Sequence, residues 1–309
     1  MQNQTRPLAP FEYFAPGSLK EALTLLQELG AGVQLLAGGT DMIQQLKDRV
    51  VRPEAIVDLR NVEELSIIEI KGDTLHIGAT ATLNEIKNSP DVQQMAPLVV
   101  EASREFGSHM LRNRATVGGN LCNASPCADL APPLLALDAS VLLRGMDAER
   151  LVPLTEFFVG AGETVLRPGE MLQRIEVPCR DGRSGYLKLG RRKGFNLSIV
   201  SVAAFGATVD GKVEDIKVAL GAVAPTPIRS TKAEAELSGN AISEAAIDRA
   251  AQMVRQDVQA EADIREATFS HERGSATFRR ASSPYRVEIS EIMARRVLTG
   301  ILNGEGAGK

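Results

Sequence analysis

The stretch "LLAGGTD" at residues 35–41 decides how this chain is interpreted. It places a Gly-Gly pair where an apolar run gives way to small polar residues. A second stretch, "TVGGN" at residues 116–120, repeats the arrangement. A single Gly-Gly pair needs no explanation beyond a turn. Two similar junctions in one chain indicate a shared task.

Such a junction can bind phosphate. A strand that ends in glycines and opens into a helix exposes backbone N–H groups where the helix dipole is positive. Glycine also lets the main chain approach a ligand closely and tolerates left-handed dihedral angles. Thr40 and Thr116 add hydroxyl donors, and Asn120 adds an amide. Because a diphosphate carries two phosphates, the sequence predicts two halves of one diphosphate clamp.

Each junction taken alone also has a simpler interpretation. Gly-Gly pairs are common in turns, Thr40 or Asp41 makes an ordinary helix cap, and Asn120 closes an Asx turn. The G-x-G-x-x-G fingerprint of a Rossmann site is absent from the sequence. Asp129, at the start of a predicted helix, is either an acceptor for a ribose hydroxyl or adenine amino group, or an N-cap.

Composition limits the class of protein. The chain has 309 residues, of which 44% are hydrophobic and 24% charged, so it fits a soluble globular protein with room for two domains. A formal net charge of −4 argues against nucleic acid as the main ligand. We expect no signal peptide and no membrane span, since no apolar run has the necessary length.

Cysteines and histidines are few. The odd number of cysteines (Cys122, Cys127 and Cys179) lacks C-x-x-C spacing and favours a reduced, cytoplasmic setting. The histidines are scattered, so we expect no metal site in this chain, and no Ser-His-Asp cluster or G-x-S-x-G elbow appears. We assign no catalytic residue, because the chemistry of such a chain belongs to a bound cofactor.

Hydrophobic periodicity predicts a small α/β unit, followed by strands and helices of an α+β fold. Ser18 with Glu21 is a capping-box signature, and Gly30 ends that helix. Before residue 180 the predicted helices are 18–29, 40–50, 82–89, 96–107 and 128–138, and the predicted strands are 32–38, 55–59, 65–70, 74–80, 140–145 and 169–178.

The polar, Gly-rich "CRDGRSG" at residues 179–185 predicts a domain boundary near residue 180. Beyond it the pattern indicates an antiparallel sheet covered by helices on one side, with a tight hairpin at "DGK", 210–212. The predicted strands are 185–192, 198–211 and 212–223, the helices are 231–237, 243–258 and 286–303, the loop is 269–284, and the disordered tail is 304–309.

Five motifs in order resemble the FAD-binding medium subunit of molybdenum hydroxylases, the family that includes xanthine dehydrogenase and carbon monoxide dehydrogenase flavoproteins. They are "LLAGGTD", "RNRATVGGNLCNASPCADLAP", "GEMLQRIEVP", "YLKLGRRKGFNLSIVSVAA" and the late "RGSATFRR" with "ARRVL". The resemblance covers nearly the whole chain. Five ordered motifs are far more specific than one.

The resemblance implies a two-part FAD-binding domain related to vanillyl-alcohol oxidase and p-cresol methylhydroxylase, at residues 1–180, with subdomains of about 1–57 and 58–180. A smaller C-terminal domain, 181–309, would follow. Asp129 would hold the adenosine end, and Leu172, Lys188 and Phe106 would lie along the flavin. The implied clamp residues are Leu35, Leu36, Ala37, Gly38, Gly39, Thr40, Asp41 and Met42, then Thr116, Val117, Gly118, Gly119 and Asn120.

Lys188 also has a rationale of its own, because an ammonium near the flavin would stabilise the anionic reduced form and raise its reduction potential. The alternative is a solvated strand lysine. The basic "GRRKG" at 190–194 is either surface charge or a docking face for an acidic partner. The chain also departs from the family. It lacks the cysteine loop that holds an extra iron-sulfur cluster in the benzoyl-CoA reductase branch. Asn196 stands where many relatives have aspartate, and Leu197 stands where some have tyrosine or isoleucine.

The resemblance implies an electron-transfer subunit that carries FAD. A small partner subunit with two [2Fe-2S] clusters would supply electrons, a large subunit would hold molybdopterin, and an external acceptor would take the electrons. A dimer of heterotrimers is implied. One alternative is a self-sufficient flavin oxidoreductase of the same fold, which often carries a covalent flavin on His or Cys. Another is a non-catalytic nucleotide-binding module, which would be colourless.

Overall fold

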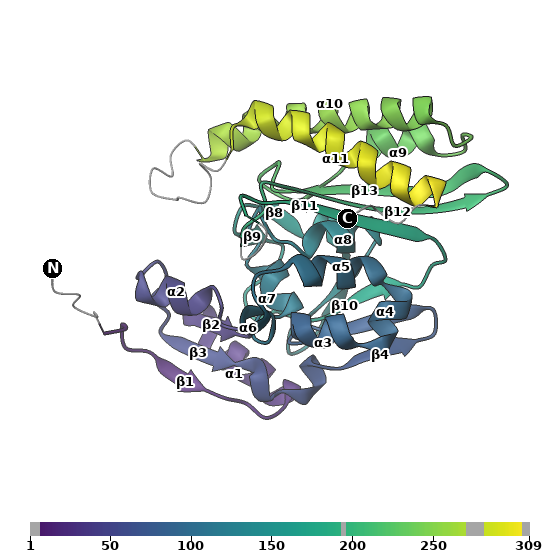
Figure 1. Cartoon of the computed structure of the whole chain (residues 1–309). Coiled ribbons are helices and arrows are strands. Elements are labelled where there is room, and N and C mark those ends of the chain that lie inside the picture. Colours follow the sequence, from purple (N-terminus) through teal and green to yellow (C-terminus); the bar gives the residue numbers. More distant parts are fainter. Residues whose placement is uncertain (1–6, 193–195, 270–280, 305–309) are drawn as a thin grey trace.

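The computed structural model describes residues 7–192, 196–269 and 281–304, although the side chains of residues 262–269 are outside the description. Sheets of three, five and four strands and one two-stranded hairpin organise these residues. In Figure 1 the three-stranded sheet lies at one end of the molecule and the long helices α10 and α11 lie at the other. Residues 305–309 of the expected tail at 304–309, and residues 270–280 of the expected loop at 269–284, lie outside the described residues.

The first sheet is parallel, with strand order β1-β3-β2. Ser18 Oγ accepts the N–H of Glu21 at 3.2 Å, but the Glu21 carboxylate accepts from Gly17 rather than from Ser18, so only half of the predicted capping box forms. The second helix is shorter than predicted, because Arg49 has a φ of 57° that ends helical geometry. The elements are β1 Glu12–Phe14, α1 Leu19–Leu29, β2 Val33–Leu36, α2 Met42–Lys47 and β3 Ala55–Asp58.

The second sheet is antiparallel, with order β4-β5-β10-β6-β7. Its strands are β4 Ile68–Lys71, β5 Thr74–Gly78, β6 Ser140–Arg144, β7 Glu149–Pro153 and β10 Met171–Pro178, and the hairpin is β8 Phe158–Gly160 with β9 Glu163–Thr164. Its helices are α3 Leu83–Asn88, α4 Pro90–Met95, α5 Pro97–Glu105, α6 His109–Arg112, α7 Val117–Cys122 and α8 Ala131–Ala136. The 3-10 turns are Gly30–Gly32, Leu59–Asn61, Glu63–Leu65 and Leu154–Glu156.

The third sheet, with order β11-β12-β13-β14, is antiparallel as predicted. Its elements are β11 Arg183–Leu189, β12 Val200–Val209, β13 Lys212–Gly221, β14 Ile228–Arg229, α9 Thr231–Leu237, α10 Glu244–Phe269 and α11 Ser283–Asn303. Asp210 and Gly211 both have positive φ, 49° and 74°, which is the backbone of the predicted tight hairpin.

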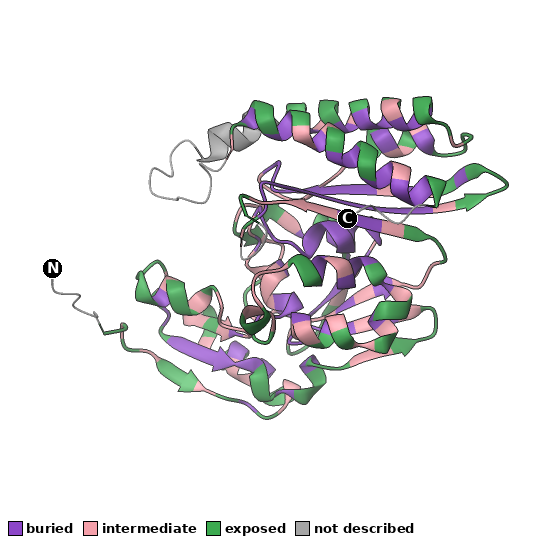
Figure 2. Cartoon of the chain, viewed as in Figure 1, coloured by how far each residue is buried: buried purple, intermediate pink, exposed green. Residues whose placement is uncertain are grey.

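The prediction that helices cover this sheet on one side only is wrong. α10 and α11 lie over one face, and the sides of these helices that face the sheet are buried in Figure 2. The other face packs against α5 and α8. At Gly221 an added Cβ would lie 2.7 Å from Pro132 Cγ of α8, so the two layers touch closely. β12 is therefore buried on both faces along Val200–Gly206, which explains its unbroken apolar sequence.

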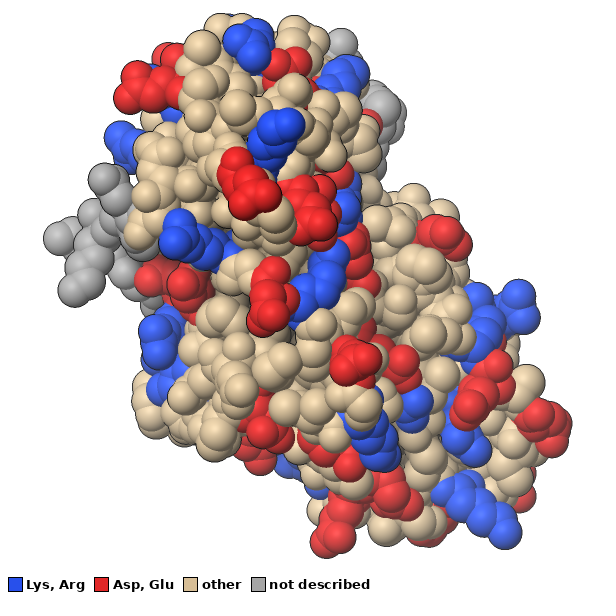
Figure 3. Space-filling model, turned by 90° about the vertical axis from the view of Figure 1, so that its right-hand side faces the viewer, with Lys and Arg blue, Asp and Glu red and all other residues tan. Residues whose placement is uncertain are grey.

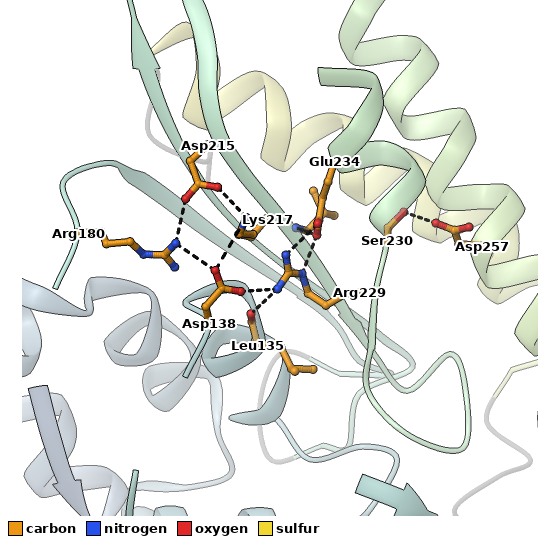
Figure 4. Close-up of polar contacts among 10 residues, drawn as sticks. Leu135, Asp138, Arg180, Asp215, Lys217, Arg229, Ser230, Glu234 and Asp257 are labelled. Atoms are coloured by element: carbon orange, nitrogen blue, oxygen red, sulfur yellow. Dashed lines mark hydrogen bonds and ion pairs between the residues drawn. The ribbon is translucent and has the colours of Figure 1, made fainter. Parts of the chain in front are cut away.

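An ionic network joins the third sheet to the segment after α8 (Figure 4). The Asp138 carboxylate accepts from Arg229 Nη1 at 2.6 Å and from Arg180 Nη1 at 3.1 Å. Arg229 also forms a two-pronged pair with Glu234, at 2.6 and 2.8 Å, and donates to the Leu135 carbonyl at 3.1 Å. Because Arg229 is mostly buried, this network fixes how the third sheet sits on the rest of the molecule.

Charge is mixed on the face of the molecule drawn in Figure 3, where Lys and Arg side chains are interspersed with Asp and Glu and no broad area has one sign. Within the described residues, no helix combines the length and apolar composition that crossing a membrane requires. The same residues hold no group of three or more His, Cys, Asp or Glu side chains arranged to bind a metal ion.

Replacing Arg229 with methionine should lower the free energy of unfolding by about 2–4 kcal/mol, because it leaves the carboxylates of Glu234 and Asp138 without their main cation. Arg255→Met is the matched control, since Arg255 is 55% exposed in its pair with Glu291 and such pairs contribute below about 1 kcal/mol. Urea-induced unfolding of each variant measures the difference. Equal losses for the two variants would contradict the role given to the network.

Candidate functional site

The first junction is a strand-to-helix turn with unpaired amides. β2 ends at Leu36, and α2 begins at Met42. Between them Gly39 has a φ of 73°, a left-handed geometry that suits glycine. The backbone N–H groups of residues 38–41 have no hydrogen-bond acceptor within the described part of the chain. Successive unpaired N–H groups at the start of a helix form a concave site for an anion.

The second junction differs from the prediction in two ways. Thr116 is joined to Thr82 only by an isolated β-bridge, so no strand precedes α7. Its amides are also already used. The N–H groups of Val117 and Gly118 donate to Ala81 O and Ala79 O, and those of Gly119 and Asn120 donate to Thr116 Oγ1 and O. The hydroxyl of Thr116 is therefore the helix cap that the simpler interpretation described.

The side chain of Asn120 also makes a hydrogen bond within the protein. Its Oδ1 accepts the N–H of Leu130 at 3.2 Å, so the carboxamide ties α7 to the start of α8. The expectation that both junctions offer free backbone amides is therefore correct for the first and wrong for the second. The second junction contributes a rigid, glycine-lined surface.

The two junctions touch. A Cβ added to Gly38 would lie 2.1 Å from the carbonyl oxygen of Arg114, two residues before the second junction. A Cβ added to Gly119 would lie 4.0 Å from the Ala37 side chain. Gln45 of α2 and Asn123, which follows α7, approach within 3.5 Å through their side-chain amides. The two junctions therefore converge, as the sequence predicts.

A cavity of about 490 Å³ opens between them. Most of the predicted site residues line this cavity: Leu35, Leu36, Ala37, Gly38, Gly39, Thr40, Asp41, Met42, Phe106, Thr116, Gly118, Gly119, Asn120 and Leu172. Three predicted residues do not line it: Val117, Asp129 and Lys188. Val117 belongs to the second junction, but it is fully buried and does not line the cavity. A cavity of this size with mixed apolar and polar walls is typical of a site for an organic ligand.

Burial shifts the pKa of two groups on the cavity wall, Asp41 and Cys122. Burial raises the pKa of Asp41, against the opposing effect of the Thr40 hydroxyl. Burial also raises the pKa of the Cys122 thiol to about 12, so this thiol is protonated at neutral pH. Cys127 is buried away from the cavity wall, and the thiols of Cys122 and Cys179 are free. These properties agree with the interpretation of Cys122 and Cys127 as small structural residues.

A third wall was not predicted from the sequence. The segment from Leu166 to Glu170, between β9 and β10, lines the cavity together with Met171 at the start of β10. Arg150 holds it through two hydrogen bonds to the Glu170 carboxylate, at 2.9 and 2.8 Å, and these bonds hold the pKa of Glu170 below its usual value. The Pro-Gly pair at 168–169 is a turn signal. Nothing in the local sequence indicates where that turn packs.

Asp129 and Lys188 form a buried ion pair. Lys188 Nζ lies 2.6 Å from Asp129 Oδ2, and each side chain is 3% exposed. Asp129 also accepts from Ser198 Oγ at 2.6 Å, and Lys188 donates to the Glu105 carbonyl at 3.2 Å. Burial raises the pKa of Asp129, and the Lys188 ammonium opposes that shift. Because the two side chains touch, the expectation that they serve opposite ends of one extended cofactor is wrong.

Neither of the two histidines in the described residues lines the cavity. His76 is on β5 and His109 is on α6, and neither lines the cavity. His271 lies outside the described residues. The arrangement therefore offers amides for an anion, apolar walls and one aromatic ring, which suit the binding and orientation of a phosphate-bearing organic ligand.

Comparisons with known proteins agree with this site. A family model for the "FAD binding domain in molybdopterin dehydrogenase" matches residues 9–180, and one for the "CO dehydrogenase flavoprotein C-terminal domain" matches residues 185–301. The carbon monoxide dehydrogenase medium chain of Hydrogenophaga pseudoflava is 34% identical over 265 residues, which cover 83% of this chain and 92% of the relative.

The glyceraldehyde dehydrogenase medium chain of Sulfolobus acidocaldarius is 32% identical over 271 residues, covering 87% of this chain and 93% of the relative. A solved structure of the Hydrogenophaga pseudoflava carbon monoxide dehydrogenase, in a form lacking the Mo-pyranopterin moiety of the molybdenum cofactor, superposes with a TM-score of 0.86 at 32% identity. That match covers 96% of this chain and 99% of the other. The resemblance and the fold class expected from the sequence are confirmed. This chain belongs to the FAD-binding subunit family of the molybdopterin dehydrogenases and is an oxidoreductase subunit.

Proposed function

We propose that this chain is the FAD-carrying electron-transfer subunit of a heteromeric molybdenum hydroxylase. It receives electrons from [2Fe-2S] clusters of a small partner subunit and passes them to an external acceptor. A large partner subunit holds the molybdopterin and hydroxylates the substrate. The assembly is a dimer of heterotrimers.

One observation carries the proposal: two glycine-lined junctions touch around a single cavity, in a chain that matches an FAD-binding family over residues 9–180. When bound, FAD supplies the reversible uptake of two electrons, which amino-acid side chains do not provide. Relatives named for carbon monoxide and for glyceraldehyde match similar shares of this chain. The choice of substrate therefore belongs, in this proposal, to the large subunit.

The residues of the cavity divide the work of binding. We assign the diphosphate to the unpaired amides of residues 38–41, because an anion needs donors that the protein has not already used. Gly118 and Gly119 provide a surface without side chains, against which the same group can lie closely. Leu35, Phe106 and Leu172 supply apolar wall for the organic parts of the ligand.

The Asp129–Lys188 pair lies behind this wall. Lys188 donates to the carbonyl of Glu105, the residue before Phe106, so the pair is near the cavity without lining it. As a pair it adds no net charge. We propose that the ammonium and the carboxylate act on the cofactor electrostatically, at a distance, rather than by contact.

We further propose a division of the chain into an FAD-binding domain at 1–180, with subdomains of about 1–57 and 58–180, and a C-terminal domain at 181–309. Separate sheets for the three parts and the polar segment after β10 support these limits. We also propose a cytoplasmic location, which the free thiols of Cys122 and Cys179 support.

Mild purification of the chain from its native host tests the function. We expect a yellow protein with one FAD per chain that co-elutes with an iron-sulfur chain and a molybdenum chain, at equal stoichiometry. Quantitative absorbance spectra and metal analysis of the eluted complex measure this. A lone yellow chain with full turnover would favour the self-sufficient flavoenzyme, and a colourless chain would favour a regulatory nucleotide module.

Gly39→Val and Gly119→Val should each weaken FAD binding at least tenfold, about 1.4 kcal/mol. Each introduces a branched side chain on the cavity wall, and at Gly39 the positive φ adds strain. Gly17→Val is the control, because an added Cβ there meets nothing within 4 Å. Titration of apoprotein with FAD gives the dissociation constants. Unchanged constants in both cavity variants would remove the clamp.

Lys188→Met should lower the free energy of unfolding by about 3–5 kcal/mol at pH 8, since it leaves the buried carboxylate of Asp129 uncompensated. Without the ammonium, the pKa of Asp129 in the folded state rises further above its unfolded value, so the folded state binds the extra proton as the pH falls. The loss should therefore shrink at pH 5. Denaturant unfolding at the two pH values measures it.

Lys188→Met with Asp129→Asn is the control for that prediction. The double variant removes both charges, so its stability should be higher than that of Lys188→Met at pH 8 and should change less between the two pH values. The midpoint potential of bound FAD should fall in Lys188→Met and return toward the unmodified value in the double variant. A pH-independent loss in Lys188→Met would contradict the assignment to Asp129.

A further inference from the structure

The carboxyl end of α5 is held by two cations from different parts of the chain. The last carbonyls of a helix have no partner within the helix, and cationic side chains can satisfy them. Lys188 donates to the Glu105 carbonyl at 3.2 Å. Arg112 Nη1 donates to the carbonyls of Arg104, at 3.2 Å, and Phe106, at 2.8 Å. This helix end is therefore fixed from two sides.

Arg112 reaches these carbonyls because the chain turns back sharply after Phe106. Gly107 has a φ of 46°, and a Cβ there would lie 2.6 Å from Leu111 Cδ2. Ser108 then caps α6, with its Oγ accepting the N–H of Leu111 at 3.2 Å. The short helix ends at Arg112, beneath the end of α5. Arg112 Nε is buried and has no hydrogen-bond partner among the described residues, so Nη1 makes the side chain's hydrogen bonds.

Phe106 is the residue that this arrangement controls. Its ring is the one aromatic side chain among the described residues that line the cavity. Its backbone carbonyl receives the shortest of the Arg112 hydrogen bonds. The ring itself is only partly buried and packs against the main core at its edge. Core packing therefore covers the ring only in part, and the hydrogen bond to its backbone carbonyl restricts where the ring can lie.

We infer that Arg112 is a positioning residue for Phe106 and acts on the ligand of the cavity only through that ring. The identity of the ligand as FAD rests on the proposed function. Arg104 and Arg114 are exposed, and Arg112 is the arginine whose side chain donates to the carbonyl of Phe106. It also gives Arg112 a role distinct from general stabilisation of the fold, because the effect must pass through Phe106.

The first experiment needs no FAD. The full chain is produced with 4-fluorophenylalanine at its nine phenylalanines, and the Phe106 resonance is identified by its absence in Phe106→Leu. Arg112→Gln should shift or broaden that resonance more than any other. Arg104→Gln is the control, because it removes an exposed cation from the same helix end and leaves its carbonyl in place. An unchanged Phe106 resonance in Arg112→Gln overturns the inference.

The second experiment is a double-mutant cycle on FAD affinity. Arg112→Gln should raise the FAD dissociation constant about tenfold in the natural background. In the Phe106→Ala background the same change should have less than about a twofold effect, because the group through which Arg112 acts is gone. An equal tenfold effect in both backgrounds overturns the inference, since Arg112 would then act by another route.

A conservative variant and the unmodified chain separate failure of this inference from failure of the proposed function. Arg112→Lys retains one donor and the charge, so it should restore part of the fluorine signal and of the FAD affinity, and it replaces Arg112→Gln if that variant does not fold. Failure of the unmodified chain to bind FAD would end the proposed function. The fluorine experiment would still decide whether Arg112 positions Phe106.

Discussion

The close approach of two backbone segments at Gly38 and Arg114 is the constraint on which the site depends. Any side chain at residue 38 would collide with the Arg114 carbonyl. Without that contact the parallel sheet of β1–β3 and the layer that carries α7 would separate, and the cavity between them would lose a wall. A glycine here is therefore a packing requirement before it is a ligand-binding one. The second motif has a different constraint, because an added Cβ at Gly118 would lie 2.6 Å from the carbonyl oxygen of Ala79.

The backbone amides of the two motifs nevertheless differ in whether they are hydrogen-bonded within the protein. Buried backbone donors are nearly always paired, so an N–H group without an internal acceptor is available to a ligand or to water. At the second junction the Thr116 side chain and the carbonyls of Ala79 and Ala81 use the amides internally. At the first junction residues 38–41 leave theirs open. The amides of the second junction are satisfied within the protein, whereas those of the first junction need a ligand or water as acceptor. Two similar sequences therefore have different roles in binding.

Sequence reasoning succeeded where the cause is local. The cap at Ser18 and the Asp210–Gly211 hairpin are both set by residues within a few positions of each other. It failed where the cause is distant. The Glu170 segment folds over the cavity because Arg150, on another strand, holds it. Asp129 and Lys188 are 59 residues apart, and no local pattern indicates that they meet.

The buried pair of Asp129 and Lys188 raises a question of energetics. A buried ion pair is often no more stable than a well-packed apolar pair of similar volume, so stability alone does not account for it. The ammonium, however, also bonds the Glu105 carbonyl, which an apolar side chain cannot do. Lys188 comes from β11, in the third sheet, while Glu105 ends a helix of the FAD-binding part. The third sheet thus also holds the end of α5, one residue before Phe106 of the cavity wall.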